Sequence, residues 1–290
     1  MIIFRTGQGV GDVLLATGVL RAWKRQHSGR VIVETHYPEI FENNLDVWKT
    51  WQEGNLVMFI QKTFNHRGIW RIGNICLKAY DHFIHKPTYP FPCRGKHLID
   101  AMAETIGVEM LPEERRPFLY LTPAELAEQS WARNWIAVQS SSSSYWTVNK
   151  NWVPGRMQSV VDELKHMGYQ LVQLGSEEDE RLSGIKDLRG KTSLREAGAI
   201  LANAKLLVGL EGGMVHLARA VNSSSVVIYT HYTLPEETGY IQNVNLRDVH
   251  ITEESCWKKE KCEVCETSSS NISPEDVLSA CEIVLNVDKI

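Results

Sequence analysis

The chain has 290 residues, of which 43% are hydrophobic and 23% charged, and its formal net charge is −4. This composition is typical of a soluble globular protein that is long enough to form two α/β domains. It excludes a secreted disulfide scaffold, because six cysteines are too few for this length, and no apolar run is long enough to cross a membrane.

A short apolar strand is predicted at the start of the sequence, over residues 1–6. Three glycines between residues 7 and 11 follow it, with a spacing one residue shorter than that of a dinucleotide-binding loop. Apolar residues then recur at helical spacing over residues 13–23, which places Asp12 at the N-cap or in the first turn of a helix. Capping alone would explain an acid there, but Asp12 also lies beside a loop that could hold a substrate oxygen.

The rest of the first half contains further elements and a basic segment. We expect a strand over residues 30–37, an irregular loop from Pro87 to Pro92 and a helix over residues 97–108. Between residues 62 and 97, seven lysines and arginines accompany a single acidic residue. A basic patch in an acidic protein favours an anionic partner, although solvated loops can carry the same charge.

Strands and helices alternate in the second half. The predicted strands are residues 135–143, 169–176, 206–210 and 223–232, and the predicted helices include 157–167 and about 273–287. Such alternation predicts a parallel, doubly wound sheet. We expect two domains of this kind, over residues 1–130 and 131–290, with a ligand cleft between them. The C-terminal helix could pack back on the first domain.

The most informative stretch combines a strand, a glycine turn and a helix at residues 206–220. Gly212 and Gly213 let a ligand approach the backbone closely, and the helix start offers free amide groups and a positive dipole end to an anion. Glu211 ends the strand at the carboxyl edge of the sheet, where α/β folds bind their ligands. His216 follows about one turn into the helix, within reach of a bound phosphate. An ordinary βα turn with a solvent-facing histidine is the simpler interpretation.

Four stretches together carry a resemblance to a known family. They are GQGVGDVLLATGVLRAWKR at 7–25, KNWVPGRM at 150–157, QLVQLGSEEDE at 170–180 and LRGKTSLREAGAILANAKLLVGLEGGMVHLARAV at 188–221. In this order they resemble the ADP-heptose:lipopolysaccharide heptosyltransferases, glycosyltransferase family 9. The chain departs from the family's motifs where Glu211-Gly212-Gly213 replaces Asp-Ser/Thr-Gly and where Gly18 replaces a proline.

The resemblance implies a GT-B fold, an α/β architecture in which two Rossmann-like doubly wound domains face a central cleft. It implies an inverting, metal-independent glycosyltransferase that moves heptose or a related sugar from a nucleotide sugar, with ADP-heptose as the expected donor and no cofactor. Asp12 would be the base that activates the acceptor hydroxyl, and Lys150 would hold the leaving diphosphate. The expected donor-binding residues are Ser143, Ser144, Lys150, Glu178, Asp179, Thr192, Glu211, Gly212, Gly213, Met214 and His216, and no metal is assigned to the site.

Within this set the resemblance implies separate roles. Glu178 or Asp179 would bind the ribose hydroxyls, and Thr192 would lie against the base. The helix start at Gly212, Gly213 and Met214 would bind the diphosphate, and His216 would add positive charge beside it.

The acceptor is expected to be an anionic glycan or glycolipid near the basic region 62–97, in the synthesis of lipopolysaccharide or another surface glycan. The protein would then be cytoplasmic, with peripheral contact at the inner face of the cell membrane. Two alternatives stay open. One is a nucleotide-sugar-binding protein without transfer activity, which the replacement by Glu211 favours. The other is a glycosyltransferase that acts on nucleic acid or protein, although nucleic acid is the less favoured partner.

The cysteines are a separate feature of the sequence. Cys256, Cys262 and Cys265 have a C-x5-C-x2-C spacing with one pair suited to zinc or iron, and Cys281 follows within a predicted helix. No second C-x2-C pair completes a four-cysteine site. Whether these residues bind a metal stays open, and Cys76 and Cys93 are expected to be plain thiols.

Overall fold

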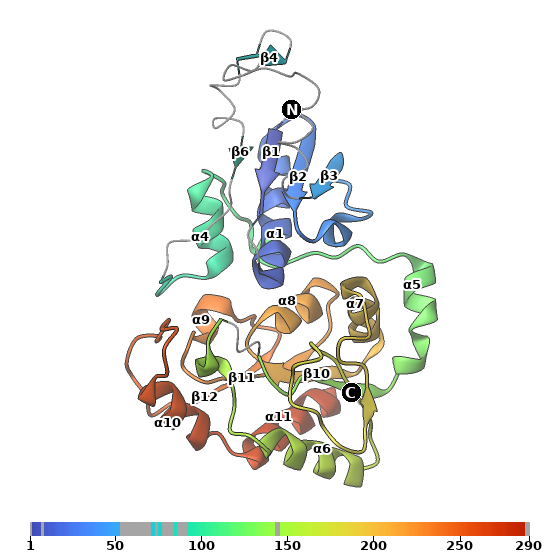
Figure 1. Ribbon diagram of the computed structural model, residues 1–290, viewed down its shortest axis with the longest axis vertical. Coiled ribbons are helices and arrows are strands. Elements are labelled where there is room, and N and C mark those ends of the chain that lie inside the picture. Colours follow the sequence, from blue (N-terminus) through green and yellow to red (C-terminus); the bar gives the residue numbers. More distant parts are fainter. Residues whose placement is uncertain are drawn as a thin grey trace. The chain divides into compact units, whose positions relative to one another are not determined.

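The computed structural model describes residues 2–6, 9–52, 92–142 and 146–287, and the backbone of short strands at 71–72, 75–76 and 84–85. The chain divides into two compact units, drawn in Figure 1. The first consists of residues 1–90 and 99–120, and the second of residues 91–98 and 121–290. The chain thus passes from the first unit to the second between Tyr120 and Leu121, whereas the sequence placed the boundary near residue 130.

The first unit contains a parallel sheet with the strand order β3-β2-β1-β6. Its strands are β1 (Ile2–Arg5), β2 (Val31–Thr35), β3 (Lys49–Gln52) and β6 (Ile84–His85). A separate antiparallel pair is formed by β4 (Arg71–Ile72) and β5 (Ile75–Cys76). In the described part of this unit the helical elements are α1 (Val10–Gln26), η1 (Pro38–Phe41), α4 (Leu98–Thr105) and η3 (Pro112–Glu114). The predicted first strand, first helix and second strand are therefore confirmed.

Helix α1 is buried over most of its circumference, and Gly18 lies at its tightest contact. A Cβ at Gly18 would lie 2.7 Å from the carbonyl oxygen of Glu114 and 2.8 Å from Ile99 Cδ1. The neighbouring Thr17 hydroxyl accepts a hydrogen bond from the Phe118 amide at 2.7 Å. Glycine thus replaces the family's proline at a position where the backbone of residues 114–118 packs directly on the helix.

The second unit contains a parallel sheet with the strand order β12-β11-β10-β7-β8-β9. Its strands are β7 (Trp135–Val138), β8 (Gln170–Gln173), β9 (Lys186–Asp187), β10 (Leu206–Leu210), β11 (Ser225–Tyr229) and β12 (Val244–Arg247). The predicted parallel, doubly wound sheet is confirmed here. The outer strands β9 and β12 are additions that the sequence pattern did not predict.

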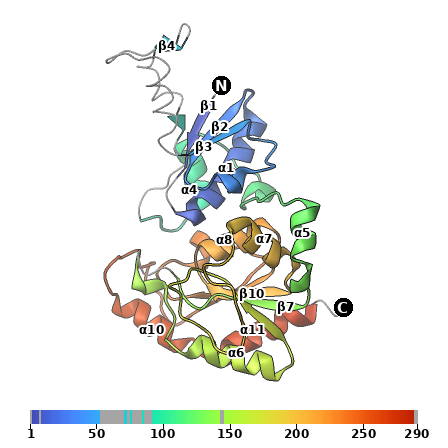
Figure 2. The same cartoon turned by 45° about the vertical axis from the view of Figure 1, so that its right-hand side comes forward.

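Helices cover both faces of this sheet, as Figures 1 and 2 show. Helices α6 (Arg156–His166) and α11 (Pro274–Val287) pack together on one face, and α7 (Leu194–Asn203) and α8 (Gly213–Ala220) lie on the other. The remaining helical elements are α5 (Pro123–Glu128), η4 (Ser130–Ala132), η5 (Val148–Lys150), α9 (Pro235–Thr238) and α10 (Glu263–Asn271).

Helix α11 completes the core of the second unit. Val277, Ala280, Cys281 and Leu285 are buried against β10, β11 and α6. Its apolar face therefore packs within the second unit, whereas the sequence suggested that this helix could pack on the first domain. Among the described residues, no helix combines the length and the hydropathy that spanning a bilayer requires.

Candidate functional site

The sheet of the second unit has a topological switch point between β7 and β10. From β7 the chain proceeds outward through β8 and β9, and it then returns to β10 on the opposite side of β7. The loops at the carboxyl ends of these two strands diverge, and open α/β sheets bind ligands at such points. Residues 139–142 follow β7, and Glu211 and Gly212 follow β10. This strand edge is the centre of the candidate site.

Lys150 and Glu211 form an ion pair at this edge. Lys150, the last residue of η5, places Nζ 2.7 Å from Glu211 Oε2, and the two side chains are 19% and 7% exposed. The ammonium also lies 5.0 Å from the centre of the Tyr232 ring. Burial by itself would raise the pKa of Glu211, but the charge of Lys150 outweighs it and lowers that pKa below its usual value. A cation is therefore held beside the start of α8.

The turn between β10 and α8 needs glycine for its backbone. Gly212 has a φ of 154° and precedes the first helical residue, Gly213. A Cβ at Gly212 would lie 3.6 Å from the hydroxyl oxygen of Ser142, so the loop after β7 passes close to the helix start. Gly212, Gly213 and Met214 are each partly exposed. The first turn of α8, the Ser142 hydroxyl and Lys150 together form an arrangement that suits an anion.

His216 has a different environment from the one that the sequence suggested. Its side chain is buried, and Nδ1 lies 2.7 Å from the Tyr240 hydroxyl. Burial lowers the pKa of His216 to about 4, so the ring is neutral at pH 7. The simpler interpretation of a solvent-facing histidine is wrong. The expectation of a positive charge beside the diphosphate is not met either, because burial disfavours the charged ring.

The turn after β8, residues 176–180, is rich in acidic residues and is called the acidic turn below. The side chain of Asp179 points inward and that of Glu178 is exposed. Asp179 is buried and accepts hydrogen bonds from the amide and the hydroxyl of Ser176, at 3.3 and 3.2 Å. Burial raises the pKa of Asp179. Glu178 is exposed, so of the two acids that the sequence offered for a ribose, only Glu178 presents its carboxylate to solvent.

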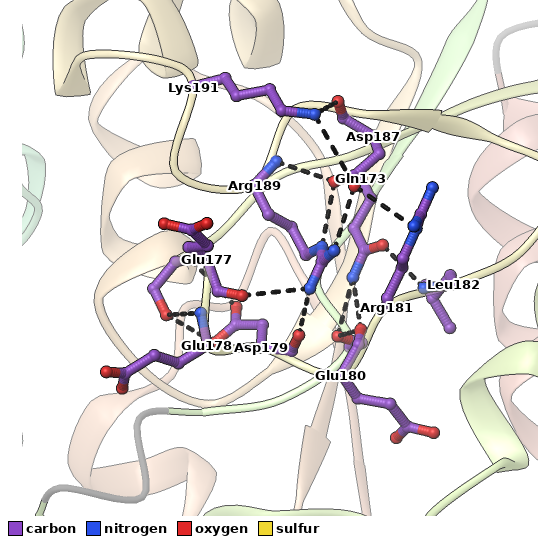
Figure 3. Close-up of polar contacts among 12 residues, drawn as sticks. Gln173, Glu177, Glu178, Asp179, Glu180, Arg181, Leu182, Asp187, Arg189 and Lys191 are labelled. Carbon is purple, nitrogen blue, oxygen red and sulfur yellow. Dashed lines mark hydrogen bonds and ion pairs between the residues drawn. The ribbon is translucent and has the colours of Figure 1, made fainter.

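Arg189 holds this turn in place through hydrogen bonds to its backbone, as Figure 3 shows. Its guanidinium donates to the carbonyl oxygens of Glu177 and Asp179 and forms a bidentate contact with Asp187 at 3.0 Å. These bonds hold the pKa of Asp187 at about 2. Thr192 follows this segment, is partly exposed, and lies directly before Ser193, the N-cap of α7.

Asp12 lies in the first turn of α1, in the other unit, and its side chain is partly exposed. The N-cap is Gly9, so of the two positions that the sequence allowed, the structure selects the first turn. Ser143, Ser144 and most of the basic region 62–97 lie outside the described residues. At the described end of that region, Arg94 donates to the Ser255 carbonyl at 3.0 Å and pairs with Glu254 at 3.5 Å.

Two further residues of the site were missed by the sequence reasoning. Tyr232 lies under the Lys150 ammonium, and Asn149 is a buried anchor for the segment that carries Lys150. Asn149 Nδ2 donates to the carbonyls of Lys258 and Glu260, at 2.8 and 2.7 Å. Asn149 directly precedes the KNW motif at 150–152 and lies outside it, and its partners are more than a hundred residues further along the chain, so the motif gave no signal for its role.

A family model for glycosyltransferase family 9 (heptosyltransferase) matches residues 82–268. This chain belongs to glycosyltransferase family 9. The match includes Lys150 and the whole turn from Glu211 to His216, whereas Asp12 lies outside it.

Relatives of this family 9 chain were found in sequence and in structure. Lipopolysaccharide heptosyltransferase 3 of Escherichia coli is 21% identical over 194 residues, which are 59% of this chain and 52% of the relative. The chain spans about half the length of the curated relatives it matches. The structure of E. coli ADP-heptose lipopolysaccharide heptosyltransferase II has a TM-score of 0.73 at 16% identity, covering 100% of this chain and 99% of that one.

E. coli heptosyltransferase WaaC with ADP is also similar in structure, with a TM-score of 0.65 at 12% identity, covering 98% of this chain and 99% of that one. At such identities these similarities establish the fold. The predicted GT-B architecture with two Rossmann-like domains is confirmed.

Proposed function

We propose that this protein is an inverting glycosyltransferase that transfers heptose or a related sugar from a nucleotide sugar to an acceptor hydroxyl of lipopolysaccharide or another surface glycan. ADP-heptose is the proposed donor. Membership of family 9 supports the class of reaction, and the E. coli relatives include heptosyltransferases, one of them described with ADP. The transfer uses charge supplied by the protein at the diphosphate and needs no metal ion there.

The observation that carries the proposal is the cation beside the helix start at the switch point. Sugar transfer leaves a nucleoside diphosphate, so negative charge grows on the leaving group in the transition state. Lys150 and the first turn of α8 would lie against that charge, with Ser142 close to the turn. Groups that already lie in place need little rearrangement at the moment of reaction, and Lys150 is held beside this turn by its ion pair with Glu211.

The other donor contacts follow from the described side chains. Exposed Glu178 would accept hydrogen bonds from the ribose hydroxyls, while Asp179 shapes the turn from inside. Thr192 would lie against the base, and Ser143 and Ser144 would add phosphate contacts beside Ser142. His216, neutral at pH 7, would serve as a hydrogen-bonding group that Tyr240 orients and would carry no charge.

Asp12 is proposed as the general base. Inversion requires that the acceptor hydroxyl attack from the face opposite the diphosphate while a base takes its proton. Asp12 lies in the first turn of α1, where the helix dipole favours negative charge. The basic region 62–97 would attract an anionic glycan or glycolipid acceptor at the inner face of the cell membrane.

The Lys150–Glu211 pair also favours a second candidate function, a nucleotide-sugar-binding protein without transfer. Glu211 already neutralises the cation that the diphosphate needs, and it replaces the shorter acid of the family motif. Both candidates bind a nucleotide sugar, and only the transferase consumes it. Turnover of the donor that is lost in Asp12→Asn would exclude the binding protein.

Calorimetry with ADP, UDP, GDP and inorganic pyrophosphate tests the donor site. We expect ADP to bind most tightly, and we expect Lys150→Ala to weaken it by at least about tenfold through the loss of a charged contact. Exposed Lys165→Ala on α6 is the matched control and should leave the affinity unchanged. No binding of any nucleoside diphosphate by the folded protein would refute the proposal.

A further inference from the structure

Three cysteines of the second unit converge at one point. Cys256 lies in the loop before α10, Cys262 is the N-cap of α10, and Cys265 lies in its first turn. Their sulfur atoms all lie within 4.8 Å of one another, and the three side chains are between 2% and 9% exposed. Cys281, the fourth cysteine of the sequence pattern, lies on α11 with its side chain buried in the core and does not join them.

The surroundings of the sulfurs suit thiolates that bind an ion. Sulfurs held about 2.3 Å from a tetrahedral zinc are about 3.8 Å apart, so small side-chain movements would bring the three into coordination. The Lys258 amide donates to Cys256 Sγ at 3.4 Å, and the amides of Val264 and Cys265 face Cys262 Sγ. Such amides stabilise the negative charge of a bound thiolate and orient it.

The segment that carries Cys256 and Cys262 has no regular secondary structure and is held by hydrogen bonds to other parts of the second unit. Residues 248–262 form neither strand nor helix, and Trp257 has a positive φ of 53°. Backbone bonds from Cys256 to the His231 carbonyl and from Trp257 to the Tyr232 carbonyl tie its middle to the segment after β11. The side chains of Thr147 and Asn149 bond its end, residues 258–262. A metal ion that joins residues 256, 262 and 265 would close the loop of chain between them.

We propose that Cys256, Cys262 and Cys265 bind one thiophilic metal ion, zinc or iron, with water in the fourth position. Binding releases the thiol protons to solvent and forms three metal–sulfur bonds. Within the part of the chain that the structure describes, no further histidine, cysteine or acidic residue joins this group. Three thiolates and a divalent ion carry one net negative charge, and exposed Lys258, Lys259 and Lys261 are close in sequence to offset it.

The segment that carries the three cysteines, residues 256–265, is linked to the candidate site by the hydrogen bonds of Asn149. The Cys262 amide donates to Asn149 Oδ1 at 2.9 Å, while Asn149 Nδ2 donates to two carbonyls of the same loop. Every polar atom of this buried side chain is thus bonded to residues 258–262. Asn149 directly precedes Lys150, so the metal fixes the loop that sets the position of the Lys150 backbone. Asn149 is on this account a positioning residue, and its role rests on the proposed function of Lys150.

Metal analysis of the full chain tests the site without reference to any activity. The protein is purified anaerobically without chelators, and zinc and iron are measured by inductively coupled plasma mass spectrometry. We expect about one metal ion per chain in the wild type and in Cys281→Ala, and a loss of at least about tenfold in Cys262→Ser. The spectrometer identifies which of the two metals is bound.

Several results would overturn the site. They are a wild-type protein that stays metal-free after incubation with Zn²⁺ and with Fe²⁺, an unchanged metal content in Cys262→Ser, and a disulfide among these cysteines in the anaerobic protein. Cys265 is the most buried of the three, so Cys265→Ser risks misfolding. Removing the metal from the wild type with a chelator, followed by circular dichroism, gives a comparison that does not depend on that variant.

The link to Lys150 is tested by the affinity for ADP. We expect chelation to weaken ADP binding at least about tenfold in the wild type and to have no further effect in Lys150→Ala. Equal affinity with and without metal would overturn the link while leaving the metal site in place. Absence of ADP binding by the metal-loaded wild type would refute the proposed function and not the metal site.

Discussion

The Lys150 ammonium lies 2.7 Å from the Glu211 carboxylate, at the point where β10 ends and α8 begins. The two residues come from loops on adjacent strands, β7 and β10, so their contact spans the switch point of the sheet. The pair holds a cation beside the helix start, and it also sets a condition for ligand binding. A diphosphate must compete with Glu211 for Lys150 or share it.

The pair should contribute to stability as a unit. Lys150→Ala leaves a buried carboxylate without its cation, and because Lys150 is partly exposed we expect a loss of about 2–3 kcal/mol in the free energy of unfolding. Adding Glu211→Gln to that variant should restore at least half of the loss, since the unpaired charge is then removed. Urea denaturation of the two single variants and the double variant measures this coupling. Additive single effects would contradict the pairing.

Stability should fall as the pH falls from about 6.5 to about 4, because His216 is buried as a neutral ring. Burial lowers its folded pKa to about 4, whereas an unfolded histidine has a pKa of about 6.5. In this window the unfolded chain takes up a proton that the folded protein does not, and the loss amounts to about 3 kcal/mol. The lowered pKa of Glu211 acts in the same direction but only below about pH 4.5.

The measurement is the free energy of unfolding between pH 7 and pH 5. We expect a positive slope with pH in the wild type and in exposed His166→Gln, and a clearly smaller slope in His216→Gln. Equal slopes in all three proteins would show that His216 is not the group responsible.

Asp12→Asn should lower kcat by roughly 10²–10⁴ and leave ADP affinity nearly unchanged, because it removes the proposed base while keeping the size of the side chain. The cost in stability should stay below about 1 kcal/mol, since asparagine keeps the size and one acceptor oxygen of the side chain in the first helical turn. Asp100→Asn is a matched control, because Asp100 is the first-turn acid of α4 and pairs with Arg115. Normal turnover by a folded Asp12→Asn would refute the catalytic role.

Arg189→Ala should affect the ribose side of the donor site alone. Without the guanidinium, the carbonyls of Glu177 and Asp179 lose their donor and the acidic turn loosens. We expect ADP affinity to fall several-fold, while the affinity for inorganic pyrophosphate stays the same. Exposed Arg181→Ala, 3.7 Å from Asp187, is the control. An equal loss for both ligands would show that the turn does not contact the ribose.

Much of the fold could be predicted because the central strands are continuous apolar runs. LLVGL became β10 and SVVIY became β11, each buried at every residue. Strand β9 has two residues and β12 is only partly buried, so neither carries a recognisable hydrophobic pattern. Helix α10 was missed because its sequence, EVCETSSSN, is rich in polar residues that favour helices poorly.

The site was predictable where its chemistry is local in the sequence. Strand, glycine turn and helix follow one another from Leu206 to Ala220, and the structure places them as expected. The charge of His216 was not predictable, because it depends on burial and on Tyr240, which lies 24 residues further on. Asp179 turned inward for a similar reason, since its bonds to Ser176 depend on the conformation of the turn.

The central claim is tested most directly by the mass of the acceptor. A surface-glycan fraction from cells that lack their own heptosyltransferase is incubated with ADP-heptose and the full chain, and the glycan is examined by mass spectrometry. The account predicts that one heptosyl unit is added by the wild type and by Lys165→Ala, with ADP released in equal amount, and that Asp12→Asn adds it at least about 100-fold more slowly. An unchanged glycan and intact ADP-heptose, with a folded protein that binds ADP normally, would contradict it.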